Sequence, residues 1–209
     1  MNGNRVSIVA GVLLAFILTR FLEDGNLLIT GVATLLAATM TRSFWEVVKK
    51  IKIGAYPRGI TVSNDSAFAY VAQMGGSVIH QIDLKTFADK TLPIGPNPRA
   101  LVLSPDQKTI YATLNASGKV VALDLALNKV VKTVTTGKAT RSLDISSDGT
   151  ALFVVNFNSA TLSKIRTSDF KILQSIKVCP DPIGVTYEPI NDRTWVACYK
   201  GSIKVFDNK

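Results

Sequence analysis

The fold is decided by residues 94–104, which read IGPNPRALVLS. Closely related phrases occur three more times, as IGAYPRGITVS at 53–63, TGKATRSLDIS at 136–146 and VCPDPIGVTYE at 178–188. The second residue of each phrase falls at 54, 95, 137 and 179, so the phrase returns after 41, 42 and 42 residues. A fixed period of about 40–45 residues with strand-like runs is typical of the blades of a β-propeller.

Each repeat contains short apolar runs that are separated by polar turns, as the strands of one blade require. The runs of the first repeat are 58–63, 67–72, 78–83 and 88–94. The fourth repeat ends after the run at 202–207, so its fourth strand is missing. Residues 46–53, EVVKKIKI, match the fourth runs of the other repeats, and we expect them to complete the last blade of an all-β, four-bladed propeller. Two alternatives stay open: the chain is part of a longer propeller, or it pairs with a copy of itself to complete a larger ring.

Three repeats also carry a recognisable motif. It reads SNDSAFAYVA at 63–72, SPDQKTIYATLN at 104–115 and SSDGTALFVVN at 146–156. These stretches resemble the YVTN-type (YncE-like) β-propeller repeat, and the resemblance covers about residues 46–209. It implies a propeller fold, whereas the family's activities range over surface-layer proteins, periplasmic binding propellers and relatives of lactonases and cytochrome-bearing enzymes. The fourth repeat departs from the motif because Glu188 begins its turn and Ile183 replaces the arginine of the other repeats.

The first 44 residues differ in composition from the rest, so we divide the chain into 1–44 and 45–209. Two apolar runs, 6–19 and 27–41, flank a short polar break. A membrane-spanning helix needs about 20 apolar residues, so each run is short by itself. We expect membrane association through residues 6–41, as an anchor, a helical hairpin or a signal region. A buried helical pair or propeller strands are the alternative.

The side of the membrane depends on how this segment is used. Basic residues follow the second run and acidic residues lie between the runs, which would hold both ends of a hairpin in the cytoplasm. A cleaved signal or a single anchor would instead export the propeller to the periplasm or the cell surface. We expect export, and the cytoplasmic alternative stays open.

Composition narrows the chemistry. Residues 46–209 contain 21 Lys and Arg against 13 Asp and Glu, a net charge of +8 that favours anionic partners. The single histidine, His80, and the two cysteines cannot form a structural zinc site or attach a haem, so we expect no metal and no cofactor. We expect Cys179 and Cys198 to be buried free thiols, with a disulfide as the alternative in an exported protein.

The main functional candidate is an arginine set at one repeat position, Arg58, Arg99 and Arg141, immediately before the innermost strand of each blade. In a closed propeller this position recurs around one mouth of the central channel. Arginine presents a planar fork of donors that suits carboxylates and phosphates. Lys138 and Lys200, on nearby loops, would add to the field. The alternative is that each arginine pairs with a repeat aspartate or with loop carbonyls.

No catalytic group stands out in the sequence. We expect His80 to be a packed or surface strand residue, since no second histidine accompanies it. We therefore expect a non-catalytic, membrane-associated binding or interaction module for an anionic small molecule, nucleic acid or protein. The alternatives are a propeller enzyme or enzyme remnant of the lactonase or oxidoreductase type, and a cell-surface structural protein.

Overall fold

The computed structural model describes residues 46–208. The chain divides into two compact units, Met1–Lys50 and Ile51–Lys209, and the second unit contains every described strand. The apolar runs at 6–19 and 27–41, and the membrane segment expected there, lie outside the described residues. Within residues 46–208, no helix is long and apolar enough to cross a membrane.

In residues 46–208, fifteen strands form four antiparallel sheets, which we call blades one to four. Blade one comprises β1 (Pro57–Val62), β2 (Phe68–Gln73), β3 (Val78–Asp83) and β4 (Asp89–Pro93). Blade two comprises β5 (Pro98–Leu103), β6 (Thr109–Leu114), β7 (Lys119–Asp124) and β8 (Lys129–Thr135). Blade three comprises β9 (Thr140–Ile145), β10 (Ala151–Asn156), β11 (Thr161–Arg166) and β12 (Ile172–Lys177). Blade four comprises β13 (Pro182–Glu188), β14 (Arg193–Cys198) and β15 (Ser202–Asp207).

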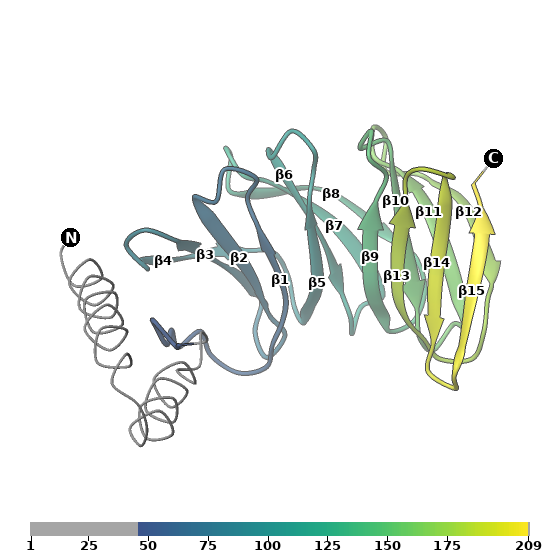
Figure 1. The fold of residues 1–209 in the computed structure, drawn as a ribbon, viewed down its shortest axis with the longest axis horizontal. Coiled ribbons are helices and arrows are strands. Elements are labelled where there is room, and N and C mark those ends of the chain that lie inside the picture. Colours follow the sequence, from purple (N-terminus) through teal and green to yellow (C-terminus); the bar gives the residue numbers. More distant parts are fainter. Residues whose placement is uncertain (1–45, 209) are drawn as a thin grey trace, which may run out of the picture. The chain divides into compact units, whose positions relative to one another are not determined.

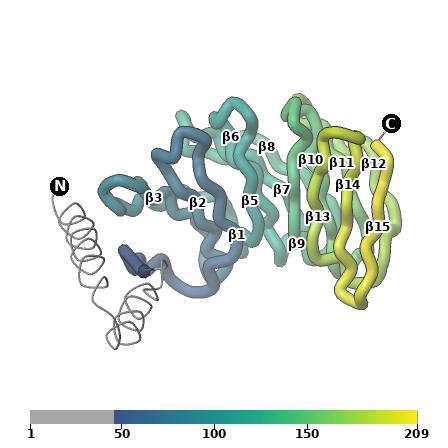
Figure 2. The backbone as a smooth tube through the Cα atoms, viewed as in Figure 1, coloured from purple at the N-terminus to yellow at the C-terminus, as the bar shows by residue number. Residues whose placement is uncertain are grey.

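The blades follow one another in chain order (Figures 1 and 2). Strands that are consecutive in the sequence are neighbours in each sheet, so every blade is an antiparallel meander. The innermost strands β1, β5, β9 and β13 contact one another in that order. This arrangement places the first strand of each repeat at the inner edge of its blade.

Three apolar clusters hold the blades together, one at each junction. Tyr70 of blade one packs with Leu101 and Leu103 of blade two. Tyr111 of blade two packs with Leu143 of blade three. The third junction contains Phe153, whose ring stacks on that of Tyr187 at 5.5 Å between centroids. An aromatic residue on the second strand therefore packs against the innermost strand of the next blade.

The Ser-x-Asp element of the motif forms the turn between the first two strands of blades one to three. In blade three, Ser146 Oγ donates to Asp148 Oδ1 at 2.6 Å and accepts from the Ala151 amide at 2.9 Å. The same oxygen of Asp148 accepts from the Thr150 amide at 3.0 Å. These bonds lower the pKa of Asp148 below its ordinary value, mainly through the serine hydroxyl. The aspartates are turn residues, as expected from the type of turn.

The expected closure by residues 46–53 is not formed. These residues contain no strand, and blade four has three strands. Ile51 and Ile53 pack against Ala69, Val71 and Ile82 of blade one. In the described part of the chain no strand pairs with the outer edge of β15, and the last residues of the segment that resembles the fourth runs, Ile51 and Ile53, contact blade one instead.

The expectation of free thiols is wrong, because Cys179 and Cys198 form a disulfide with a Cα–Cα distance of 6.1 Å. Cys198 ends β14 opposite Pro182, the first residue of β13, and Cys179 lies in the turn that leads into that strand. The equivalent turn residues of the other blades are glycines, and a Cβ on them would collide with the last residue of the second strand. The two cysteines thus occupy repeat positions that touch in every blade.

Candidate anion-binding site

One residue with a left-handed backbone precedes each innermost strand by one position. Its φ angle lies between 53° and 56° in all four repeats. These residues are Tyr56, Asn97, Ala139 and Asp181. The carbonyl oxygen of each accepts the amide of the residue that follows the second strand, with N–O distances of 3.0 Å, from Met74, Asn115, Phe157 and Tyr199 respectively. This bond gives the start of each innermost strand the same place in every blade.

A β-bulge follows at the arginine position. In blade two, Pro98 is opposite Leu114 and Leu101 is opposite Ala112, so Arg99 and Ala100 share one partner residue. The register shifts at the same place in blades one and three, where the bulge contains Arg58 and Arg141. A bulge of this kind re-aims a side chain away from the regular alternation of the sheet.

The three arginines come from adjacent innermost strands. Gly59 allows β1 to approach β5 closely, since a Cβ there would lie 2.8 Å from the Arg99 carbonyl oxygen. Burial lowers the pKa of the Arg99 guanidinium, and the positive charges of Arg141 and then Arg58 lower it further. Arg99 therefore lies within electrostatic range of both other arginines of the expected set.

Their partners are not carboxylates. The Arg141 guanidinium lies over the Phe157 ring, with Cζ 3.5 Å from the centroid, and its buried Nε has no hydrogen-bond partner. Arg99 Nη1 contacts Met74 Sδ at 3.5 Å. The ion pairs among the described residues are His80–Asp89, Arg166–Asp169 and Lys171–Asp169. The repeat aspartates bind serines instead, at the opposite ends of the strands.

Phe157 and Met74 are contacts of the arginines that the recurrence of arginine in the sequence does not reveal. Both occupy the position after the second strand, which the repeat alignment also assigns to Asn115 and Tyr199. In each blade the residue after the second strand donates its amide to the left-handed residue that precedes the innermost strand. A sequence alignment of the repeats shows that these two positions recur. It does not show that they are in contact.

Lys138 and Lys200 are both exposed and lie on the same end of the blades as the arginines. Lys138 lines a depression of about 630 Å³ at the junction of blades two and three, together with Asn115, Gly118 and Asn158. The Lys138 amide donates to Ser159 Oγ at 2.7 Å, which fixes the loop. Lys200 lies in the turn between β14 and β15. The two lysines are therefore loop residues, while the arginines are held by strands.

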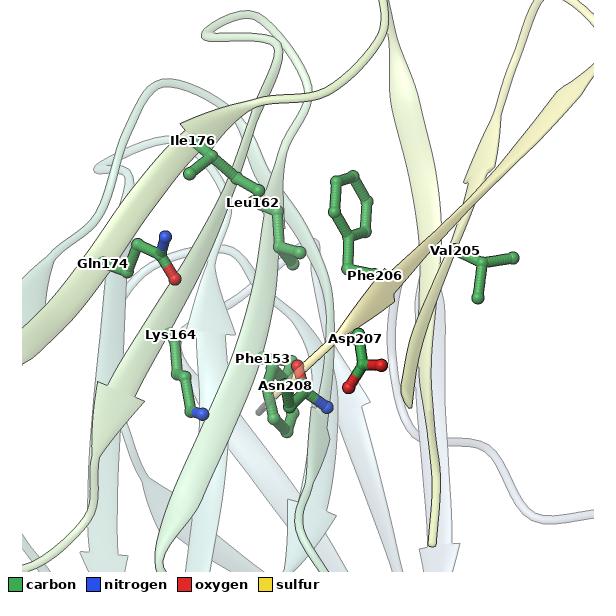
Figure 3. A pocket seen from close by; sticks show the side chains of 9 residues that line it. All are labelled: Phe153, Leu162, Lys164, Gln174, Ile176, Val205, Phe206, Asp207 and Asn208. Carbon is green, nitrogen blue, oxygen red and sulfur yellow. The ribbon is translucent and has the colours of Figure 1, made fainter. Parts of the chain in front are cut away.

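A second pocket, of about 340 Å³, lies at the junction of blades three and four (Figure 3). Its lining is mixed, with Phe153 and Ile176 on one side and Phe206 and Asp207 on the other. Lys164 projects toward this space, and its Nζ lies 5.6 Å from the centroid of the Phe153 ring. The charges here have both signs, so this pocket is less selective for anions than the arginine position.

His80 is a buried strand residue. Its Nδ1 lies 2.7 Å from Asp89 Oδ2 and its Nε2 lies 3.1 Å from Gln73 Oε1, so both ring nitrogens have partners. Within residues 46–208, no three His, Cys, Asp or Glu side chains gather in a way that could hold a metal ion.

Comparisons with solved structures identify the architecture. Hydrazine synthase from Kuenenia stuttgartiensis matches with a TM-score of 0.69 and 19% identity, over 78% of this chain and 49% of that chain. A protein described as a 6-phosphogluconolactonase from Bacteroides fragilis matches with a TM-score of 0.65 and 18% identity, over 74% and 51%. Virginiamycin B lyase from Staphylococcus aureus matches with a TM-score of 0.58 and 20% identity, over 72% and 55%.

The chain is built of β-propeller blades. It spans about half the length of the propeller proteins that it matches. At these identities the likeness shows the fold alone. No family model matches the sequence. A search of curated proteins also finds no match.

Proposed function

We propose that this protein is a non-catalytic binding module of YVTN-type repeats whose arginine-bearing end receives an anionic group. The observation that carries the proposal is the set of three neighbouring guanidiniums without a carboxylate partner among the described residues. The arginines are held by strand bulges rather than by flexible loops. A binding site on strands holds its geometry better than one on loops.

Electrostatics supports this assignment. Burial lowers the pKa of the Arg99 guanidinium most, and the positive charges of Arg141 and Arg58 lower it further, so the charged form of Arg99 carries a free-energy cost in this site. A bound phosphate or carboxylate would offset the repulsion and accept charge-assisted hydrogen bonds from the guanidiniums. The stacking of Arg141 on Phe157 orients its guanidinium in advance, which lowers the entropic cost of binding.

The proposed location is the exterior of a membrane, with residues 6–41 as the anchoring or signal segment. The Cys179–Cys198 disulfide supports export, because disulfides persist in oxidising compartments. The proposed partner is an anionic small molecule, a nucleic acid or an acidic protein surface, since guanidinium groups recognise the anion rather than the rest of its carrier.

An enzyme is the second candidate, and the names of the structural neighbours favour it. One is described as a 6-phosphogluconolactonase and another is a lyase. A phosphorylated lactone would satisfy the same arginines. Hydrolysis of 6-phosphogluconolactone that is lost on replacing Arg99 would assign this protein to the enzymes and replace the proposal of a binding module.

The test is a binding titration of the full chain with a labelled twelve-nucleotide single strand of thymidines as the polyanion. We expect the variant R58A/R99A/R141A to bind at least about tenfold more weakly, because one charge-assisted hydrogen bond contributes about 1.5 kcal/mol or more. The slope of log K against log salt should fall by about 2, since each phosphate contact on a single strand contributes about 0.7.

A matched control removes the same charge from the other end of the blades. Lys85, Lys108 and Lys129 are exposed and lie at that end, and K85A/K108A/K129A should keep most of the affinity and the slope. Equal losses in the two triple variants would mean that the polyanion responds only to net charge. Unchanged binding by R58A/R99A/R141A, with an unchanged circular dichroism spectrum, would remove the arginine site.

A further inference from the structure

We infer that two copies of this chain associate head to tail, with blade four of each packed against blade one of the other, to close one ring of eight blades. Two observations support this inference. The same repeat positions form each contact between blades within the chain, and the equivalent side chains on the end faces of blades one and four are exposed. The inference does not depend on the proposed anion site.

Each internal junction uses the same repeat positions. The blade that comes first contributes an aromatic residue of its second strand and an apolar residue of its third strand. The blade that follows contributes apolar residues of its innermost strand. At the junction of blades one and two these are Tyr70 and Ile79 on one side and Leu101 and Leu103 on the other, all of them buried.

Blade four carries the first half of this junction, and the side chains that form it are exposed. Trp195 is the equivalent of Tyr70, and it is 39% exposed. Ile203 is the equivalent of Ile79, and it is 65% exposed. The counterparts of Ile203 in blades two and three, Val120 and Leu162, are buried. Blade four therefore has the side chains for a following blade.

Blade one presents the second half. Ile60 is the equivalent of Leu101, Leu143 and Val185, which are all buried, yet Ile60 is 66% exposed. Val62, the equivalent of Leu103, is 46% exposed. The end faces of a single chain are thus the two complementary halves of a contact that the chain makes three times internally.

The outer edge of the junction is complementary as well. Ile51 and Ile53 pack against blade one, as Leu92 and Ile94, at the end of the outer strand of blade one, pack at the junction with blade two. Residues 51–53 thus lie where the outer strand of a preceding blade would end. Within the described residues, blade four has three strands, and no strand pairs with the outer edge of β15. Its docking on blade one of another copy would bring that edge beside the segment that resembles a fourth strand.

A second copy fits better than another protein because each face of this chain matches the other face of the same chain. A head-to-tail contact forms a closed ring when its rotation returns to the start, and eight blades lie within the usual range of four to eight. The arginines of both copies would then face one channel.

The experiment is the solution mass of the full chain in a non-ionic detergent, by light scattering after gel filtration, with the detergent contribution subtracted. We expect twice the chain mass of 22.5 kDa. The variants Ile60→Glu and Trp195→Glu should each give the mass of a single chain, because each places a charge in both contacts of the ring. Leu127→Glu is the matched control, since Leu127 is 66% exposed in the turn between β7 and β8, away from both end faces.

Mixing the two variants tests whether the contact between copies is head to tail. Ile60→Glu chains keep an intact blade four and Trp195→Glu chains keep an intact blade one, so the mixture should recover one contact and part of the dimer. A wild-type monomer, a species larger than two chains, or a dimer that both variants leave intact would each overturn the inference.

Discussion

Two charged residue types recur in the repeats and have opposite roles. The aspartates of the Ser-x-Asp turns bind hydroxyl and amide groups within a few residues, so they stabilise local structure. Arg141 instead lies over the Phe157 ring, and Arg99 contacts the thioether of Met74. The carboxylates of the repeat aspartates accept hydrogen bonds from groups in the same turn. The Nε of Arg141, in contrast, has no hydrogen-bond partner.

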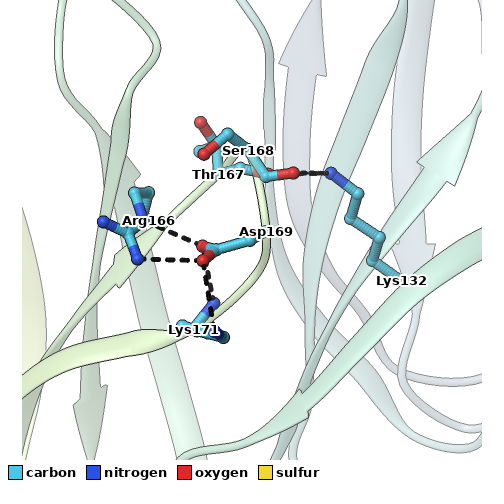
Figure 4. A network of polar contacts seen from close by, with 6 residues as sticks. All are labelled: Lys132, Arg166, Thr167, Ser168, Asp169 and Lys171. Atoms are coloured by element: carbon cyan, nitrogen blue, oxygen red, sulfur yellow. Dashed lines mark hydrogen bonds and ion pairs between the residues drawn. The ribbon is translucent and has the colours of Figure 1, made fainter.

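The pKa of the Asp169 carboxyl can be tested directly. Its Oδ1 and Oδ2 accept from Arg166 Nε and Nη2, each at 2.9 Å, on the surface of blade three (Figure 4). This pair lowers the pKa of Asp169 from 3.8 to about 2. We expect NMR titration to show this pKa, and we expect Arg166→Gln to return it toward 3.8.

Lys171 provides the control for this experiment, since it also lies near Asp169. Lys171→Gln should change the pKa of Asp169 much less, because Lys171 Nζ lies 3.9 Å from Oδ2. A carboxyl with a lowered pKa in the folded state stabilises the protein above its unfolded pKa, and this contribution disappears as the pH falls through the folded pKa. The stabilisation from Asp169 should therefore be complete above about pH 4 and lost toward pH 2. Equal effects of the two variants would contradict the assignment to Arg166.

At the scale of the element, blade four differs from the other blades in the described residues because it has three strands and contains the disulfide. The bond joins residues that are 19 apart and ties the turn before β13 to the end of β14. Cross-linking a loop of this length reduces the entropy of the unfolded chain. The disulfide therefore stabilises the pairing of β13 with β14 at this end of blade four.

We expect the variant C179A/C198A to lower the stability of blade four by about 3 kcal/mol. The measurement is native-state hydrogen exchange of the amides in β14 and β15, with the amides of β6 in blade two as the internal control. Protection should fall in blade four and stay unchanged in β6. Equal protection in blade four with and without the bond would show that strand pairing alone holds this blade.

At the scale of the whole molecule, the main feature is the exposed apolar side chains on the end faces of blades one and four. Each internal junction buries an aromatic residue and the innermost strand of the next blade, and the end faces expose the corresponding side chains. Burial of such groups stabilises association by about 25 cal/mol for each Å² of apolar surface removed from water. The proposed ring would use the same apolar burial between copies that joins the blades within a chain.

Trp195 provides a signal for that association. In a chain that carries Trp45→Phe, Trp195 is the only tryptophan. Its fluorescence emission should shift to longer wavelength on dilution, because the copies separate and the indole of Trp195 becomes exposed to water. The variant Ile60→Glu should show the longer wavelength at every concentration. A wavelength that does not depend on concentration in the parent chain would contradict burial of Trp195 between copies.

Much of the blade pattern is predictable from the sequence, because it depends on local periodicity and turn chemistry. The run predicted at 67–72 is β2 at Phe68–Gln73, and the run predicted at 78–83 coincides with β3. The all-β propeller class is confirmed. The recurrence of Arg58, Arg99 and Arg141 before the innermost strands is likewise visible in the repeat spacing. Alternation of apolar residues and turn-forming residues determines these features within a few residues of chain.

Other features depend on contacts between residues far apart in the sequence, and only the tertiary structure decided them. The bulge at each arginine is a property of strand register, and the disulfide depends on two repeat positions that touch across a sheet. The segment at 46–53 has the pattern of a strand, but a strand forms only where an edge is within reach to pair with it. The sequence by itself determined what each blade is made of, whereas the packing of blade on blade decided which groups are left without partners.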